Sequence, residues 1–439
     1  MESKSKQLIK NINNKKITVI GAGISGLGAC YLAKKLNAKV FLSDICMVEP
    51  SIEKKLITNN IKYELGEHTN ECLKADLIII SPGIDINKNN ILKKINELDI
   101  LTVSEIEFAS WFTKNPIIAV TGSNGKSTVV KLLYNIFKNK YPNTLLGGNI
   151  GKSFSENILH EINNNKSNVI HILEISSFQL ERIVTFSPKV SCILNITSDH
   201  LDRYRNNDEY FKTKLKITSN YNNDSYIVFD DSNQKLLYNY KNFKNAIPFS
   251  SIKVDKYLSK NKLIGKHNRE NLKACIIISK IFDIKYEELK STISNFTPLE
   301  HRMEVFKKIN GITFINDSKG TNIFSTKAAI NSFNKNIILI LGGSKGDINK
   351  KDFIELTKAN RISYIICYGE IGNKLLLLYK NVIPATYHEL FRDAIIASIK
   401  KAKDGDKVLL SPAFKSYDQF ENFEKRGNNF KKIVNSYYA

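Results

Sequence analysis

The chain has 439 residues, of which 42% are hydrophobic and 25% charged, so collagen-like and wholly disordered classes are excluded. This length exceeds one ordinary core and predicts about three domains. The net charge of +22 fits nucleic acid, an anionic membrane surface or anionic small substrates. The lysines form no single tract with interleaved aromatic residues, so we expect local anion sites and no nucleic-acid groove.

Cysteine spacing and hydropathy bear on the cellular compartment. The six cysteines form no C-x-x-C pair and no zinc-type ligand set, so we expect reduced thiols. A basic start followed by the apolar stretch 17–33 imitates a signal peptide, but four glycines at 21, 23, 26 and 28 disfavour one. No other run approaches the ~18 apolar residues of a spanning helix. We therefore expect a cytoplasmic protein without stable membrane insertion.

Apolar runs alternate with helical periodicity along the chain, which is typical of parallel sheets with helices on both faces. The pattern predicts an α/β fold of three domains with mostly parallel sheets, at 1–104, 105–298 and 299–439. The predicted strands are Ile17–Ile20, Val40–Leu42 and Leu77–Ile80, then Ile117–Val120, Val169–Leu173, Cys192–Leu194 and Tyr226–Phe229, then Thr313–Ile315, Ile337–Leu341, Tyr364–Cys367 and Val408–Leu410.

The first strand runs into Gly21-x-Gly23-x-x-Gly26 and a helix, and Asp44 follows the next strand. This is the context of a Rossmann-like dinucleotide fold, in which glycines let the backbone approach a diphosphate. NAD is the default ligand, and a uridine diphosphate fits the same physics. The motif predicts a diphosphate site and leaves the nucleotide open.

A second glycine loop follows the strand Ile117–Val120 and opens another helix. Its residues Thr121-Gly122-Ser123-Asn124-Gly125-Lys126-Ser127-Thr128 give the compact pattern G-x-x-G-K-S. Backbone N–H groups of such a loop cradle phosphates, the lysine neutralises them, and a hydroxyl can bind magnesium. Val120 stands where the usual P-loop has its first glycine. The strand, loop and helix still predict a phosphate site.

Two further polar positions follow predicted strands. Glu174 comes directly after a buried apolar run, where a charge needs a cation such as magnesium or a lysine. The cluster 199–204 follows the next strand, and Lys214 lies in a helix-like stretch after it. A solvated face would explain this second cluster equally well.

Together these segments resemble the Mur ligase family. The motifs are 121–128, Gly-Gly-Asn-Ile-Gly at 147–151, Glu-Ile-Ser-Ser-Phe at 174–178, Asp-His-Leu-Asp-Arg-Tyr at 199–204, His267-Asn268-x-x-Asn271, His301-Arg302-x-Glu304 and Asn316-Asp317-Ser318-Lys319-x-Thr321-Asn322. Segment 409–430 resembles the members that add D-glutamate. The resemblance implies a UDP-binding domain, a central P-loop-type ATPase domain and a Rossmann-like carboxyl-terminal domain.

The family also implies a reaction and its cofactors. We expect an ATP-dependent amide ligase that adds D-glutamate to UDP-N-acetylmuramoyl-L-alanine through an acyl phosphate, using two magnesium ions. The implied catalytic residues are Lys126, Glu174, His200 and Lys214; Ser127, Glu174, His200 and Lys214 would bind metal, and Lys214 stands where relatives carry a carbamylated lysine. The implied ATP contacts are Gly122, Ser123, Asn124, Gly125, Lys126, Ser127, Thr128, Asn268, Asn271, Arg302 and Asp317.

The resemblance also assigns the other two substrates. The UDP-linked substrate would contact Gly23, Ile24, Ser25, Asp44, Ser81, Pro82, Gly83 and Asn149. D-glutamate would contact His200, Thr321, Lys345, Ser416 and Phe423, for which a helix core and a helix cap are ordinary alternatives at Phe423 and Ser416. The sequence departs from the family pattern at Cys46, near the expected uracil, at the short Gly342-Gly343-Ser344-Lys345 loop, and at Phe414-Lys415.

Three alternatives stay open at this point. Another amino-acid-adding Mur ligase, such as one for L-alanine, would keep the fold and mechanism. A nicotinamide dehydrogenase explains the first glycine loop but leaves the second without a role. A basic P-loop protein that binds nucleic acid explains the charge but not the first loop. A monomer with no nucleic-acid partner is the expected state.

Overall fold

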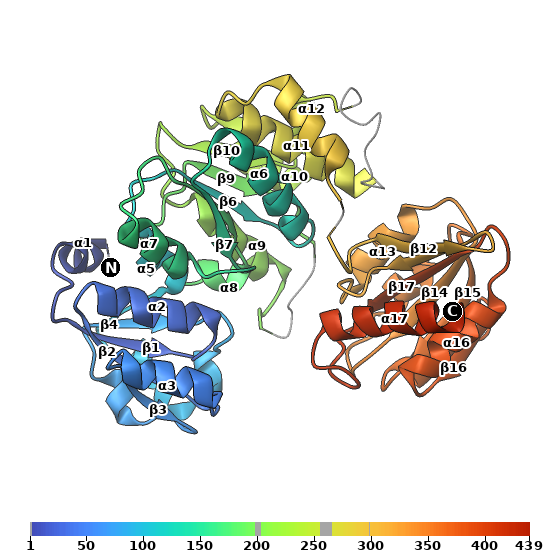
Figure 1. Cartoon of the computed structure of the whole chain (residues 1–439), viewed down its shortest axis with the longest axis horizontal. Helices are drawn as coiled ribbons and strands as arrows, with labels where there is room; N and C mark the ends of the chain where they lie inside the picture. Colours follow the sequence, from blue (N-terminus) through green and yellow to red (C-terminus); the bar gives the residue numbers. More distant parts are fainter. Residues whose placement is uncertain (1, 198–202, 255–265, 298) are drawn as a thin grey trace. The chain divides into compact units, whose positions relative to one another are not determined.

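A computed structural model describes residues 2–197, 203–254, 266–297 and 299–439. It contains three sheets, which confirms the predicted α/β fold of three domains (Figure 1). Two compact units make up the chain: Met1–Val254 with Glu270–Ile293, which holds the first two sheets, and Asp255–Arg269 with Ser294–Ala439, which holds the third. The domain boundaries at 104 and 298 stay predictions.

The first sheet is parallel throughout, in the order β3-β2-β1-β4-β5. Its central strand β1 is buried except at its first residue, because helices cover both faces. The strands are β1 (Lys16–Ile20), β2 (Lys39–Asp44), β3 (Lys62–Leu65), β4 (Leu77–Ile80) and β5 (Leu101–Ser104), and the helices are α1 (Glu2–Lys10), α2 (Ile24–Lys35), α3 (Pro50–Thr58), α4 (Asn90–Lys93) and α5 (Glu105–Ser110).

The second sheet is also parallel, in the order β11-β10-β9-β6-β8-β7. Its strands are β6 (Ile117–Thr121), β7 (Thr144–Gly148), β8 (Ile170–Glu174), β9 (Val190–Ile193), β10 (Tyr226–Phe229) and β11 (Ala246–Pro248). Its helices are α6 (Lys126–Lys140), α7 (Phe154–Asn163), α8 (Ser177–Leu180), α9 (Asn207–Leu215), α10 (Gln234–Tyr240), α11 (Lys266–Ile281) and α12 (Tyr286–Asn295).

The first two sheets share one continuous hydrophobic core. Helices α2, α5 and α7 pack together where the sheets approach each other (Figure 1). Gly28 on α2 has no room for a Cβ, which would collide with the Ser153 side chain before α7. The apolar cluster runs from Leu42 and Ile106 to Phe154 and Leu173. This shared core explains why two sheets form a single compact unit.

The third sheet has the order β12-β13-β17-β14-β15-β16, with β12 antiparallel to β13 and the other pairs parallel. Its strands are β12 (Glu304–Ile309), β13 (Ile312–Asn316), β14 (Ile337–Gly342), β15 (Ile362–Tyr368), β16 (Ala385–His388) and β17 (Lys407–Ala413). Its helices are α13 (Ile323–Asn331), α14 (Lys350–Glu355), α15 (Gly372–Tyr379), α16 (Phe391–Lys401) and α17 (Phe423–Tyr437).

All eleven predicted strands are present, some of them one to three residues longer at an end than predicted. Ser411 and Pro412, expected just after a strand, lie inside β17, which continues to Ala413. Five of the six cysteines are buried and unpaired, and Cys46 is exposed. Among the described helices, none has both the length and the apolar character needed to cross a membrane.

Candidate active site

The second glycine loop joins β6 to α6 as predicted. Gly125 has a left-handed backbone, with φ of 86°, and a Cβ there would collide with the side chain of Asn271 on α11. Glycine is therefore required, and Asn271 lies against the loop. The N-cap residue of α6 is Gly125, which has no side chain to bond the first-turn N–H groups, and such groups suit an anion. The loop has the architecture of a phosphate site.

Asn195, two residues after β9, holds this loop in place. Its Oδ1 accepts the N–H of Asn124 at 2.8 Å, and its Nδ2 donates to the Asn124 carbonyl at 2.9 Å. Its own carbonyl accepts the N–H of Ser123 at 2.8 Å. Sequence reasoning missed Asn195, although a polar residue just beyond a buried strand beside β6 was a usable signal.

Two lysines lie at the loop. Lys126 Nζ donates to the carbonyls of Gly122 at 2.8 Å and Ser123 at 3.0 Å. Lys214, from α9, also donates to the Gly122 carbonyl, at 3.1 Å, and its Nζ lies 4.7 Å from the centre of the Tyr210 ring. The Lys214 residue is only 1% exposed. Both lysine Nζ atoms therefore lie at the Gly122 carbonyl, and Lys126 begins the helix whose amino terminus suits a phosphate.

Glu174 is the last residue of β8 and lies opposite Val120 of β6 in the parallel register. Its Oε1 accepts a hydrogen bond from Asn149 Nδ2 at 2.9 Å, which joins two predicted site residues. Glu174 and Ser127 are each 2% exposed. A carboxylate and a hydroxyl beside a phosphate loop fit Mg²⁺, which takes one or two carboxylates together with substrate phosphates.

The described residues contain no group of three or more His, Cys, Asp and Glu side chains placed to hold a metal. His200, predicted as a metal and D-glutamate ligand, lies outside the described residues together with Asp199.

The first glycine loop joins β1 to α2. Gly21 has φ of 98°, and a Cβ at Gly26 would collide with the Gly21 carbonyl, whereas a Cβ at Gly23 would meet no atom within 4 Å. The first and third glycines therefore serve the turn and the packing, and Gly23 leaves its surface open to a ligand. Ile24, which begins α2, is 65% exposed.

Asp44, at the end of β2, supports this loop. Its Oδ2 accepts the N–H of Ala22 at 2.5 Å, and its Oδ1 accepts the N–H of Cys46 at 2.8 Å. From β4, Ser81 Oγ donates to the Gly21 carbonyl at 3.1 Å. The acidic residue expected to contact the UDP-linked substrate thus also fixes the backbone around the expected diphosphate.

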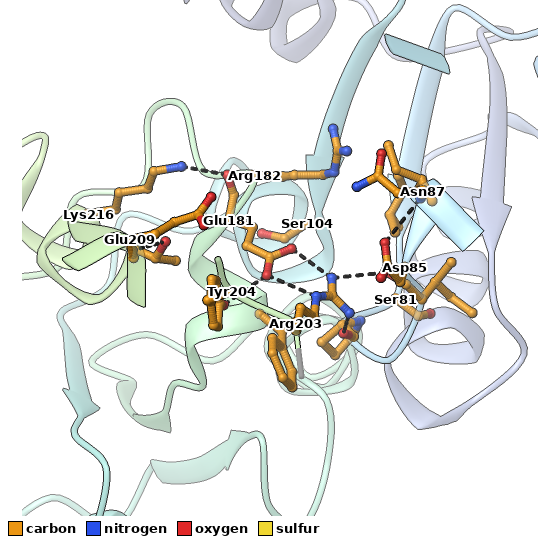
Figure 2. Close-up of a pocket in the computed structure, with 16 residues that line it drawn as sticks. Ser81, Asp85, Asn87, Ser104, Glu181, Arg182, Arg203, Tyr204, Glu209 and Lys216 are labelled. Atoms are coloured by element: carbon orange, nitrogen blue, oxygen red, sulfur yellow. Dashed lines mark hydrogen bonds and ion pairs between the residues drawn. The ribbon is translucent and has the colours of Figure 1, made fainter. Parts of the chain in front are cut away.

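Ser81, Pro82 and Gly83 follow β4, and two cavities adjoin this segment. One, of about 240 Å³, is lined by Ser81 and Pro82 and reaches α9 (Figure 2). The other, of about 370 Å³, is lined by Gly83 and reaches Ile45 and His68 beyond β2 and β3. The predicted substrate segment therefore faces open space.

In the second unit, Arg302 and Asp317 lie in one region. The backbone on either side of Arg302 is left-handed, with φ of 61° at His301 and 49° at Met303, a conformation that is uncommon for residues other than glycine. Burial raises the pKa of the Asp317 carboxyl to about 7, while the nearby Arg302 and Arg426 charges act in the opposite direction. Asp317 Oδ2 accepts a hydrogen bond from Ser411 Oγ at 2.7 Å.

Hydrogen bonds join the loops that carry the predicted D-glutamate residues. Ser318 Oγ donates to the Phe423 carbonyl at 2.9 Å, and the N–H of Ser344 donates to the Lys415 carbonyl at 3.0 Å. The fully buried Arg426 donates to Ser318 Oγ at 2.9 Å and to the Phe414 carbonyl at 3.1 Å.

The four described residues of the five predicted to contact D-glutamate differ in exposure. Ser416 is 2% exposed, Lys345 is exposed, and Thr321 and Phe423 are half-buried. Phe423 begins α17, and Lys319 Nζ lies 4.9 Å from its ring centre, so it is not a core residue of that helix. Ser416 lies in a turn after β17 and caps no described helix.

Comparison with known proteins adds family information to this geometry. Three family models match: the MurD-like N-terminal domain of Mur ligases at residues 15–102, the Mur ligase middle domain at 120–293, and the Mur ligase glutamate ligase domain at 301–414. A relative from Christiangramia forsetii, named UDP-N-acetylmuramoylalanine–D-glutamate ligase, is 35% identical over 96% of this chain and 99% of its own. The chain belongs to the Mur ligase family.

A further relative and two solved structures are also Mur ligases. The equally named protein of Clostridioides difficile is 33% identical over 97% of this chain and 99% of its own. Among solved structures, the UDP-N-acetylmuramate–alanine ligase of Thermotoga maritima covers 96% of this chain and 99% of its own, with a TM-score of 0.60 and 16% identity. A Thermotoga maritima MurF ligase in complex with ADP covers 98% and 97%, with a TM-score of 0.59 and 14% identity. These structures establish the shared fold.

Within this Mur ligase, Ser123, Asn124 and Lys126 belong to the phosphate loop, and Lys214 and Asn271 lie against it. Asn268 is buried on α11, and Thr128 is buried in the first turn of α6. The assignment of each residue to ATP, metal or substrate stays a prediction. Besides Asn195, the sequence analysis did not predict the contact of Arg203, which donates hydrogen bonds to the segment after β4.

Proposed function

We propose that this Mur ligase joins D-glutamate to UDP-N-acetylmuramoyl-L-alanine with ATP, as a step of peptidoglycan precursor synthesis. The observation that carries the proposal is a pair of glycine loops in one compact unit. One has Lys126, Ser127 and Glu174 around it, and the other has no lysine and an open Gly23. A reacting triphosphate fits the first and a spectator diphosphate the second. The names of relatives at 33–35% identity supply the amino acid.

The first step is a phosphoryl transfer. The terminal carboxylate of the muramoyl-alanine attacks the γ-phosphorus of ATP, which gives an acyl phosphate and ADP. Lys126 neutralises charge on the transferring group, and the N–H groups of the loop hold the phosphates. Mg²⁺, when bound, lowers the charge repulsion between these anions; Ser127 and Glu174 would hold one ion, and His200 and Lys214 a second.

The second step is an acyl transfer. The amine of D-glutamate attacks the acyl carbon, the carbon–oxygen bond to phosphate breaks, and the amine loses a proton as the amide forms. Thr321, Lys345, Ser416 and Phe423 would hold the amino acid, with a cation and hydroxyls for its two carboxylates. No protein nucleophile is required.

Several finer points belong to the proposal. Lys214 would act as a metal ligand after carbamylation, which replaces its buried ammonium with an anion. Asn268, Asn271, Arg302 and Asp317 would contact the nucleotide. A monomer in the cytoplasm, with no nucleic-acid partner, stays the expected state.

The test is phosphate release from ATP and Mg²⁺ with UDP-N-acetylmuramoyl-L-alanine. D-glutamate is compared with L-glutamate, L-alanine and no amino acid. Release that requires D-glutamate is the expected result. Release with another amino acid would keep the mechanism and refute the specificity, and no release with any amino acid would refute the ligase assignment.

A further inference from the structure

Arg203 makes an unusual set of contacts for a residue that no step of the proposed mechanism uses. It lies between β9 and α9, in the same compact unit as both glycine loops. Its Nε and Nη2 donate to the two carboxylate oxygens of Glu181, at 3.1 and 2.7 Å. Its guanidinium carbon lies 4.5 Å from the centre of the Phe178 ring. The paired hydrogen bonds to Glu181 and the contact with the Phe178 ring together fix the plane of the guanidinium.

The remaining N–H donors of Arg203 bond residues of the first predicted domain. Nη1 donates to the Pro82 carbonyl at 3.3 Å, and Nη2 to the Ile84 carbonyl at 3.1 Å (Figure 2). These carbonyls belong to the segment 81–84 that follows β4. Ser81 at the start of this segment donates to Gly21. The segment is therefore held on one side by the first glycine loop and on the other by Arg203.

The residues that contact Arg203 lie close in the chain to Glu174, a residue of the predicted ATP site. Phe178 and Glu181 lie in and just after α8, which begins three residues after Glu174. Tyr204 OH donates to Glu181 at 2.8 Å, its ring stacks on Phe178, and Lys216 Nζ donates to the Glu181 carbonyl at 2.8 Å. A chain of direct contacts thus connects the first glycine loop, the segment 81–84, Arg203 and the helix that follows Glu174.

Arg203 also separates the two cavities beside the segment. Ile84, Asp85, Phe178 and Arg203 line both of them. The side chains of Arg203 and Glu181 are only 17% and 25% exposed, and their charges cancel, so the pair adds little net field to the site. The pair instead contributes by holding the wall between the two cavities in one position.

We propose that Arg203 is a positioning residue that fixes the segment 81–84, and with it the muramoyl end of the substrate, relative to the phosphate loop. The inference rests on the proposed function. A reacting carboxylate must lie close to the γ-phosphorus, and a displacement of about 1 Å can cost on the order of 100-fold in rate. Lysine would keep the charge but lose the planar fork, so it would replace arginine only in part.

The experiment compares Arg203→Met, Arg203→Lys and Glu181→Gln with the wild type. For each, the KM of UDP-N-acetylmuramoyl-L-alanine, the KM of ATP and kcat are measured with D-glutamate. We expect Arg203→Met to lower kcat by up to about 100-fold, to raise the muramoyl KM about tenfold and to change the ATP KM by less than about twofold. Arg203→Lys should lie between Arg203→Met and the wild type, and Glu181→Gln should change the muramoyl KM in the same direction.

Arg205→Met is the matched control, because Arg205 is two residues away, its side chain is 88% exposed and, among the described residues, it forms its ion pair with Glu209 on α9. It should behave as wild type. An unchanged muramoyl KM in Arg203→Met, or equal rises in both KM values, would overturn the inference. If turnover of Arg203→Met is too slow to measure, calorimetry gives its affinity for the muramoyl substrate without ATP. A melting curve shows whether the variant is folded. An inactive wild type would refute the proposed function instead.

Discussion

The two glycine loops of the first compact unit share one backbone design and differ in their side chains. Each follows a buried parallel strand, opens a helix without a side-chain cap, and uses glycine where a Cβ would collide. The loop after β1 is tied by the carboxylate of Asp44. The loop after β6 is tied by the amide of Asn195 and carries the ammonium groups of Lys126 and Lys214.

The difference shows how one anion-binding device can serve two purposes. Backbone N–H groups at a helix start suffice to hold a diphosphate that does not react. Phosphoryl transfer needs positive charge where negative charge develops, which the backbone alone does not supply. Under the proposed function, Lys126 supplies this charge at the loop where phosphate is transferred, and the loop tied by Asp44 binds the diphosphate that does not react.

The largest expected effect tests this division at Lys126. Lys126→Met should lower kcat on the order of 10³-fold, because the transferring phosphoryl group loses its neutralising cation. Calorimetric affinity for the UDP-linked substrate should stay within about twofold, since this loop does not hold the diphosphate. A variant with substantial phosphate release would contradict the division between a reacting and a binding loop.

The reciprocal change is Asp44→Ala at the other loop. The N–H of Ala22 loses its acceptor, and the UDP-linked substrate loses a predicted contact, so the KM of this substrate should rise about tenfold. The KM of ATP should not change. Steady-state kinetics with each substrate varied in turn check this, and equal rises in both KM values would show that the loops are not independent.

A pair of glycine substitutions sharpens the comparison within the first loop. Gly23→Ala adds a methyl group in open space with an ordinary backbone, so the melting temperature should hold while the KM of the UDP-linked substrate rises several-fold. Gly26→Ala should destabilise the fold by about 1–3 kcal/mol, because its Cβ meets the Gly21 carbonyl. Denaturant unfolding and kinetics separate the two; similar behaviour of both variants would refute the assignment of roles.

The smallest effect concerns the joint between the two sheets that carry the loops. Glu105, at the start of α5, accepts the N–H of Ser155 on α7, and its other oxygen has no hydrogen-bond partner among the described residues. Burial raises the pKa of the Glu105 carboxyl from 4.5 to about 7. Between these values the folded protein keeps a proton that the unfolded chain has released. Stability therefore falls as pH rises through this window, by at most about 1.4 kcal/mol per pH unit.

Glu105→Gln should flatten this dependence, which unfolding curves from pH 4.5 to 7.5 would measure. Asp317, whose pKa is also raised to about 7, contributes a slope of the same sign, so the informative quantity is the difference between variant and wild type. Asp317→Asn is the parallel control in the second unit. Identical slopes for Glu105→Gln and the wild type would show that Glu105 does not titrate in this window.

Sequence patterns predicted the centre of each sheet and missed its margins. The eleven predicted strands are the inner strands, and the six that were missed are the two edge strands of every sheet: β3 and β5, β7 and β11, β12 and β16. Inner strands such as β14 are buried along their whole length and read as continuous apolar runs. Edge strands such as β16 are half-buried throughout, so their composition is mixed.

The sequence by itself indicated the α/β class, the two glycine loops, the family, and the positions of Lys126 and Glu174 next to predicted strands. These features depend on residue types at short, regular spacing. Only the tertiary structure showed that Asn195 contacts the phosphate loop, that Asp44 accepts an N–H of the first glycine loop, and that Arg203 contacts the segment after β4. Arg203 and Pro82 are 121 residues apart, and Asn195 and Asn124 are 71 apart. Such contacts arise from the packing of sheets and loops against each other. A local pattern can mark a residue such as Asn195 as a candidate, but it does not identify the distant residue that it contacts.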